Sequence, residues 1–298
     1  MDVLKVQYIS QAQAVQRSGR AGRQGPGICY RLFREDKFKN LQAMQTPEIL
    51  RCNLLSVCLD LFAMGIKNLP QFDFIDKPSV ESIHAAIDQL VWLGAVDEKG
   101  RNSLTEQGYI MARFPLDPTL SKALITAEAM GCLKETIIAV SMLSVDSVFH
   151  IPISPEQEQK QNIFRSDDGD HVTLVNVYLS FISNGCNKSW CLEHRVDYRN
   201  LNQAKKIVDQ LTDIIDELGW DIETHGQDTE PLRICLASGL FFKAAMLQPD
   251  KSYKAVMSSR EVHIHPSSCL FPYRSATRNL PPCVIYTELV QSSKSYMR

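Results

Sequence analysis

The sequence predicts a multidomain α+β protein, and three observations support this fold class. Residues 1–45 show an extended, a helical and a second extended pattern, as at the end of an α/β domain. Residues 46–115 and 116–229 are mainly helical, and the first of these stretches contains a small hairpin signal. Residues 230–298 begin with a helix and continue as short apolar runs broken by prolines, which is typical of a small β domain. We therefore expect four domains, over 1–45, 46–115, 116–229 and 230–298.

The opening segment has clear start and stop signals. Residues 3–9 alternate apolar and polar side chains and predict a strand with no partner in this sequence, because the chain begins there. Ser10 is a good N-cap, and Gly25-Pro26-Gly27 would end the helix that Ser10 begins. Residues 28–33 predict a second strand. Such a piece cannot bury its own faces, so we expect Met1 to be an internal methionine of a longer protein.

Residues 46–115 predict a winged-helix module. Pro47 opens a helix with apolar residues at helical spacing as far as Met64, and residues 80–93 predict a second helix. Two short apolar pairs flank Lys99-Gly100 and predict a hairpin, after which Thr105 caps a short helix. Modules of this kind bind nucleic acid or serve as rigid spacers.

The remaining chain is helical and then β-rich. We expect a mostly exposed connection over 151–170, helices over 173–182 and 201–218, and one more helix from Pro231. After Leu247 the apolar runs become short, and prolines separate them. This change in the sequence pattern predicts a β domain at the end of the chain.

Composition limits the class of protein. The nine cysteines are odd in number and scattered, which indicates reduced thiols in an intracellular compartment. No apolar run approaches the ~20 residues that span a membrane, so no membrane partner is expected. Residues 1–40 carry a net charge of +5 and residues 231–298 carry +6, whereas the whole chain carries −2. Two basic ends around an acidic middle suit contact with a polyanion.

The most specific motif is Gln16-Arg17-Ser18-Gly19-Arg20-Ala21-Gly22-Arg23. On a helix that continues to Gly25, Gln16, Arg20 and Arg23 lie at i, i+4 and i+7 and point to one side. Gly19 and Gly22 leave room beside them. Guanidinium groups match phosphate oxygens and stabilise a transferring phosphoryl group, so the motif predicts a triphosphate site. The alternative is a solvated basic helix face.

Other clusters point less clearly to a site. Cys186, Cys191 and His194 could suggest zinc, but a fourth ligand at standard spacing is missing. His263 and His265 lie on one face of a predicted strand, where facing a phosphate or packing in a turn is favoured over metal binding. Residues 167–170, Asp-Asp-Gly-Asp, lack the spacing of a calcium loop and predict a loop with a helix cap. We therefore expect no metal held by this chain's own residues.

The motif at 16–23, continued by Gly27 to Leu32, resembles the last helicase motif of the DEAH-box (DEAH/RHA) RNA helicases. The resemblance runs to the end of the chain in the family's order. Residues 47–54 resemble the entry into the family's winged helix, and residues 104–118 resemble the exit from it. Residues 169–178 resemble the ratchet domain, and residues 265–268 and 284–289 resemble the oligonucleotide-binding (OB) fold. Val208 departs from the family, in which many members carry arginine. The resemblance implies the end of a RecA-like domain, a winged helix, a helical-bundle (ratchet) domain and an OB-fold β-barrel.

The resemblance also implies a function. ATP and Mg²⁺ would lie between two RecA-like domains, with the Mg²⁺ ligands and the phosphate loop supplied by a part preceding Met1. Gln16, Arg20 and Arg23 would face the γ-phosphate, and the ratchet and OB fold would close over single-stranded RNA. Arg260, His263 and His265 are the candidate RNA contacts in the basic end of the chain.

Partners and location follow from the same resemblance. A glycine-rich activator protein would dock on the OB fold, and a nuclear or nucleolar location is favoured over the cytoplasm. The alternative is a non-catalytic RNA- or activator-binding module. The chain alone, which contains no Gly-Lys-Thr loop and no Asp-Glu-Ala-His box, is expected to be inactive on ATP.

Overall fold

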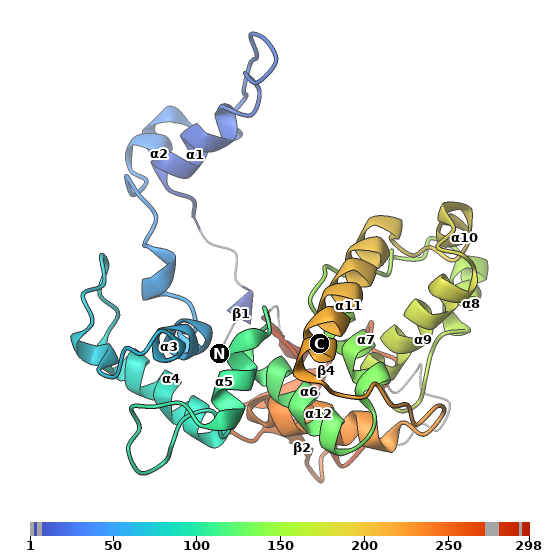
Figure 1. Cartoon of the computed structure of the whole chain (residues 1–298). Helices are drawn as coiled ribbons and strands as arrows, with labels where there is room; N and C mark the ends of the chain where they lie inside the picture. The colour runs from blue at the N-terminus through green and yellow to red at the C-terminus, as the bar shows by residue number, and fades with distance from the viewer. Residues whose placement is uncertain (1–2, 5–7, 272–279, 292–293) are drawn as a thin grey trace.

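The computed structural model describes residues 3–4, 8–271, 280–291 and 294–298. Its first segment projects from the rest of the molecule (Figure 1) and contains α1 (Gln11–Ser18) and α2 (Glu35–Lys39). Ser10 caps α1 as expected, in a capping box with Gln13. Backbone hydrogen bonds from Gln11 and Ala12 to the carbonyls of Gln42 and Ala43 hold α1 to the returning chain.

Three expectations for this segment are wrong. Helix α1 ends at Ser18, with Gly19 as its C-cap, so it does not continue to Gly25. Glycine is a poor helix former, and two glycines in four residues stop the helix early. Residues 28–33 form no strand; they are mostly exposed, and among the residues that the structure describes no strand pairs with them. The first strand does have a partner, because β1 (Val3–Leu4) pairs in parallel with β6 (Leu289–Gln291).

The winged-helix region is built on η1 (Glu48–Leu50), α3 (Leu55–Ala63), η2 (Leu69–Gln71), α4 (Val80–Trp92) and α5 (Glu106–Arg113). The single helix expected from Pro47 to Met64 is wrong. It is split because the Asn53 side chain accepts a hydrogen bond from the Leu55 N–H and starts α3 afresh. The buried face of α3 is therefore not the predicted stripe but consists of Leu55, Cys58, Leu59 and Phe62.

The predicted hairpin and its helix cap are confirmed. Val96 and Leu104 form an antiparallel bridge, and the Thr105 hydroxyl accepts a hydrogen bond from the Gly108 N–H at 3.0 Å. A Cβ atom at Gly108 would lie 2.1 Å from the Ala95 carbonyl oxygen, so only glycine allows α5 to lie against the chain that leaves α4.

The ratchet region is a helical bundle around one large apolar core. Its helices are α6 (Pro118–Ala129), α7 (Leu133–Leu143), α8 (Pro155–Asn162), α9 (Asp170–Ser183), α10 (Lys188–Glu193) and α11 (Tyr198–Leu218). The exposed connection expected at 151–170 contains α8, which Ser154 caps, and helix α10 was not predicted. Helix α8 has no apolar stripe that would predict it, because the residue it buries is polar. The amide of this residue, Gln161, donates to the carbonyls of His150 and Arg195.

Helix α12 (Glu230–Leu240) connects the bundle to the sheet and packs closely on α6. A Cβ atom at Gly239 would lie 1.9 Å from the Thr119 carbonyl oxygen, so this close approach requires glycine. A 3-10 turn, η3 (Phe241–Lys243), then leads into the first strand of the sheet.

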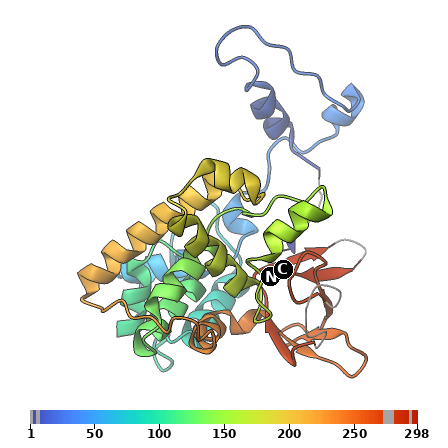
Figure 2. The ribbon, with the colours of Figure 1, turned by 90° about the vertical axis from the view of Figure 1, so that its right-hand side faces the viewer.

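The predicted β domain is confirmed as a curled sheet beside the ratchet helices (Figure 2). Its strands are β2 (Ala244–Leu247), β3 (Tyr253–Ala255), β4 (Glu261–Ile264), β5 (Cys283–Ile285), β6 and β7 (Ser295–Met297). With β1 at one edge, the order is β1-β6-β7-β4-β3-β2-β5. The described strands therefore form a half-barrel around a small core that includes Tyr253, Val262 and Leu289. Across the parts of the chain that the structure describes, no helix has the length and apolar character to cross a membrane.

Candidate nucleic-acid interface

The arginine motif lies on an open surface. Gln16 is in the last turn of α1, Arg20 is in the turn that follows, and Arg23 is in a bend. All three side chains are exposed, and a Cβ atom at Gly22 would have nothing within 4 Å. The structure keeps the three residues on one short segment but not on one helix face, because α1 ends before Arg20. A phosphate group can reach all three from solvent.

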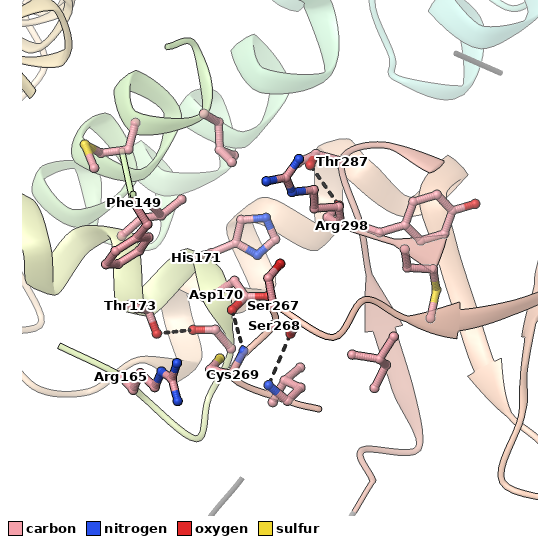
Figure 3. A pocket seen from close by; sticks show the side chains of 18 of the residues that line it. Phe149, Arg165, Asp170, His171, Thr173, Ser267, Ser268, Cys269, Thr287 and Arg298 are labelled. Carbon is pink, nitrogen blue, oxygen red and sulfur yellow. Dashed lines mark hydrogen bonds between the residues drawn. The ribbon is translucent and has the colours of Figure 1, made fainter. Parts of the chain in front are cut away.

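A cavity of about 1090 Å³ lies between the ratchet bundle and the sheet (Figure 3). Stretches from both regions meet around it. Residues 142–152, 161 and 165–174 belong to the bundle, 233–237 belong to α12, and 264–270, 281–288 and 297–298 belong to the sheet. A site assembled from both regions can hold a ligand that touches both.

One hydrogen bond joins the two walls of the cavity. The Cys269 N–H donates to an Asp170 carboxylate oxygen at 2.8 Å, across 99 residues of sequence. Asp170 is placed by a sharp turn in which Gly169 has φ of 122°, a conformation that favours glycine. The Thr173 hydroxyl closes the same turn, since it accepts from the Ser166 N–H and donates to the Gly169 carbonyl. The contact between the two walls therefore rests on short hydrogen bonds that are partly or fully buried.

The charges on the cavity walls are mixed. Three arginines and five carboxylates line it: Arg165, Arg233, Arg298, Asp146, Asp167, Asp168, Asp170 and Glu288. Several of these carboxylates have partners. Asp170 holds the Cys269 N–H, Asp168 accepts from the Thr229 hydroxyl and lies 4.0 Å from Arg233, and Glu288 lies 3.5 Å from Arg298. The cavity walls therefore carry both groups that attract phosphates and carboxylates that repel them.

The remaining wall groups are hydrogen-bonding and apolar. Figure 3 shows Ser267, Ser268, Thr173, Thr287 and Phe149 around the opening. His171 also lines the cavity, and burial lowers its pKa while the neighbouring Asp170 partly offsets the effect. A neutral imidazole and hydroxyls can exchange hydrogen bonds with sugar and base edges, and an exposed ring edge can pack against a base.

The three predicted RNA contacts lie elsewhere on the sheet. The rings of His263 and His265 lie 6.2 and 5.7 Å from the ring of Tyr296, and Arg260 is exposed in the turn before β4. His263 is 3.3 Å from Glu261, and the Ser267 N–H donates to Nδ1 of His265. None of the three predicted residues lines the cavity.

Sequence reasoning therefore missed Asp170, His171, Thr173, Ser267 and Ser268 as site residues. The signal was present, because two of the motif signatures, 169–178 and 265–268, contain all five. They stand far apart in sequence, and only the folded chain shows that they meet.

The alternative zinc site finds no support in the geometry. Over the described ranges, no three His, Cys, Asp or Glu side chains gather as metal ligands. His194 instead stacks on Trp190, with ring centroids 4.6 Å apart, and Cys191 is buried.

Comparison with known families matches three consecutive regions of the chain. Residues 86–116 match the winged-helix part of the helicase-associated domain (HA2), residues 117–174 match its ratchet-like part, and residues 232–298 match an oligonucleotide/oligosaccharide-binding fold. These matches cover both walls of the cavity.

Similar proteins align along the whole chain. ATP-dependent RNA helicase DHX33 of Homo sapiens is 44% identical over 301 residues, and the pre-mRNA-splicing factor ATP-dependent RNA helicase DEAH10 of Arabidopsis thaliana is 42% identical over 314. The pre-mRNA-splicing factor ATP-dependent RNA helicase prp22 of Schizosaccharomyces pombe is 40% identical. The chain spans 42%, 43% and 25% of the lengths of these relatives. Along its whole length the chain is similar to the C-terminal winged-helix, ratchet and OB-fold region of DEAH-box RNA helicases.

Proposed function

We propose that this chain is the RNA-holding part of an ATP-dependent RNA helicase that couples ATP hydrolysis to movement on, or remodelling of, RNA. The observation that carries the proposal is the cavity between the ratchet bundle and the OB fold, with its walls joined by Asp170 and the Cys269 N–H. The names of the relatives support it, since each is an ATP-dependent RNA helicase. We keep the proposed domains at 1–45, 46–115, 116–229 and 230–298.

The RNA would be single-stranded. Its bases would face the apolar wall near Phe149, and its sugars would meet the hydroxyls of Thr173, Ser267 and Ser268. Phosphates would pair with Arg165, Arg233 and Arg298. Each neutralised phosphate contributes about 0.7 to the log–log salt slope for a single strand, so three arginines predict a slope of about −2.

The arginine motif would serve ATP. Gln16 would contact the γ-phosphate or its attacking water, and Arg20 and Arg23 would stabilise charge on the γ-phosphoryl group. The fit rests on their exposure and on the open space at Gly22. ATP bound with Mg²⁺ would supply the phosphoryl group, and the Mg²⁺ ligands would come from the part of a full-length protein that this chain, which spans 42% of DHX33, does not include.

Two further parts of the proposal concern partners and location. The OB fold would also receive a glycine-rich activator protein, and the enzyme would act in the nucleus or nucleolus. The splicing-factor names of two relatives support the nuclear location. If the 298 residues act alone, the same cavity serves a non-catalytic RNA- or activator-binding module.

The test is a fluorescence-anisotropy titration of a labelled single strand with the 298-residue chain over a range of salt concentrations. We expect binding with little sequence preference and a slope near −2. Absence of binding would reject the RNA proposal. A parallel ATPase assay distinguishes the two forms of the proposal: RNA-stimulated turnover by the full-length protein supports the enzyme, and its absence leaves only the binding module.

A further inference from the structure

Two buried cysteine thiols lie side by side in the core of the ratchet region, away from the cavity. The Sγ atoms of Cys132 and Cys235 are 3.3 Å apart, although 103 residues separate them in sequence. Cys132 is the N-cap of α7, and Cys235 lies within α12. The side chains are 1% and 0% exposed. The pair therefore connects the turn between α6 and α7 with the helix that leads into the sheet.

The two thiols are not equivalent. The hydrogen bond with Cys235 is the main cause that lowers the pKa of Cys132, and burial opposes it. The same contact and burial raise the pKa of Cys235. Cys132 also sits at the N-terminus of an 11-residue helix, where the backbone N–H groups favour a negative charge. Cys132 is thus the nucleophile of the pair, and Cys235 retains its proton.

The other cysteines with a resolved shift are less reactive. Burial raises the pKa of Cys58 to about 12 and of Cys191 to about 11, and it also raises the pKa of Cys269. Cys29, Cys52 and Cys283 are exposed. Among the contacts that the structure shows, no second pair of thiols lies as close as Cys132 and Cys235.

We propose that Cys132 and Cys235 are a modification site, at which hydrogen peroxide forms a reversible disulfide between α7 and α12. The Cys132 thiolate attacks one peroxide oxygen and breaks the O–O bond, which gives a sulfenic acid and hydroxide. The Cys235 thiol then attacks the Cys132 sulfur, the S–S bond forms, and the sulfenic hydroxyl leaves as water. In total, two thiols and one peroxide give one disulfide and two waters, so sulfur is oxidised and peroxide oxygen is reduced.

The geometry requires little movement. A disulfide has its sulfurs about 2.05 Å apart, so the two Sγ atoms approach by about 1.3 Å, which is within the reach of side-chain rotation. Segment 220–228 is almost entirely exposed and lies beside the turn that carries Cys132, because His225 is bonded to the Met130 carbonyl and the Lys134 N–H donates to the Glu223 carbonyl. Local opening of this segment would give peroxide a route to the pair.

The link would join the ratchet bundle covalently to the helix that carries the OB fold. Because it closes a loop of about 100 residues, it removes conformational freedom from the unfolded chain and raises the melting temperature. This proposal does not depend on the proposed binding of RNA or ATP.

The test treats the reduced 298-residue chain with hydrogen peroxide near neutral pH, alkylates the remaining thiols under denaturing conditions, and maps unreduced peptides by mass spectrometry. We expect a peptide in which Cys132 is linked to Cys235, with a mass about 2 Da below that of the two free thiols, and dithiothreitol should reverse it. Cys235→Ser should leave Cys132 unlinked and over-oxidised. Cys58→Ser, an equally buried control in the winged-helix core, should leave the link intact.

Two results would overturn the proposal. One is the absence of the 132–235 peptide under conditions that oxidise the exposed Cys29 and Cys52. The other is a 132–235 peptide that appears only when urea is present during the peroxide treatment, because that would show a link formed in unfolded rather than native protein. Both measurements use the wild-type chain, so a variant that fails to fold does not weaken them.

Discussion

The arginine segment and the ratchet–OB cavity differ in how far this chain completes them. Gln16, Arg20 and Arg23 are exposed on a projecting segment that shares no core with the rest (Figure 1). The cavity has two walls, buried turns and a direct bond from Asp170 to the Cys269 N–H. A phosphate site needs groups on several sides of the anion, whereas a single strand needs one continuous groove. Under the proposed function, one chain would hold a two-walled RNA site beside only one side of an ATP site.

The largest effect should come from the unfinished site. Arg23→Ala in the full-length protein should lower RNA-stimulated ATP turnover by roughly 10³-fold, the scale expected for an arginine that stabilises a transferring phosphoryl group. ATP binding should suffer less, because the loss falls on the transition state. Steady-state kinetics with Arg17→Ala as the matched exposed control would measure this. Near-normal turnover in Arg23→Ala would make the segment a solvated basic surface.

The next effect concerns the joint between the walls. Asp170→Ala leaves the Cys269 N–H without its partner, and an unsatisfied buried donor costs about 1–3 kcal/mol of unfolding free energy. We expect that loss in urea unfolding of the 298-residue chain, together with about tenfold weaker RNA binding, which equals about 1.4 kcal/mol. Asp213→Ala, an exposed carboxylate on α11, is the control. Equal stability of the two variants would show that the walls are not joined through Asp170.

A smaller effect should show whether RNA binds in the cavity or on the outer surface of the OB fold. Arg233 lines the cavity and Arg260 does not, although both belong to the basic end of the chain. Arg233→Ala should flatten the salt slope of RNA binding by about 0.7, and Arg260→Ala should leave it unchanged if the strand stays in the cavity. The reverse result, from the same titration, would favour the predicted contacts at Arg260, His263 and His265.

The smallest effect should be on pH dependence. Burial lowers the pKa of His171 and of His265 below the usual value of about 6.5, with Arg298 adding to the effect at His265. Both imidazoles are therefore neutral at pH 7, and RNA affinity should not change between pH 8 and pH 7. As the pH falls through these lowered pKa values, protonation adds positive charge and should strengthen binding. His171→Asn should reduce that rise, and an equal rise in the variant would exclude His171.

The sequence predicted regular elements well where one local signal decided them. Ser10 and Thr105 each accept a backbone hydrogen bond at the start of a helix, as predicted, and apolar spacing predicted α4 and most of α11. The predictions of secondary structure were wrong where another local hydrogen bond, a helix-breaking residue or the lack of a pairing strand determined the structure. Asn53 split a helix, two glycines shortened α1, and no strand that the structure describes pairs with residues 28–33.

The site was predicted only in part for a related reason. The arginine motif is contiguous, so its residue types and spacing were visible in the sequence. The cavity depends on a contact between residues 170 and 269, and no local pattern reports a distance across 99 residues. His263 and His265 drew attention as a pair, yet they pack around Tyr296, while the nearby Ser267 and Ser268 line the cavity.

The central claim is that single-stranded RNA lies in the cavity between the ratchet bundle and the OB fold. Ultraviolet cross-linking of a uridine-rich strand to the 298-residue chain, followed by mapping of the linked peptides, tests it most directly. The account predicts links within 142–152, 165–174 and 264–270, which are three of the stretches that form the walls, and none within 16–23. Links confined to the turn around Arg260, or to the arginine segment, would contradict it.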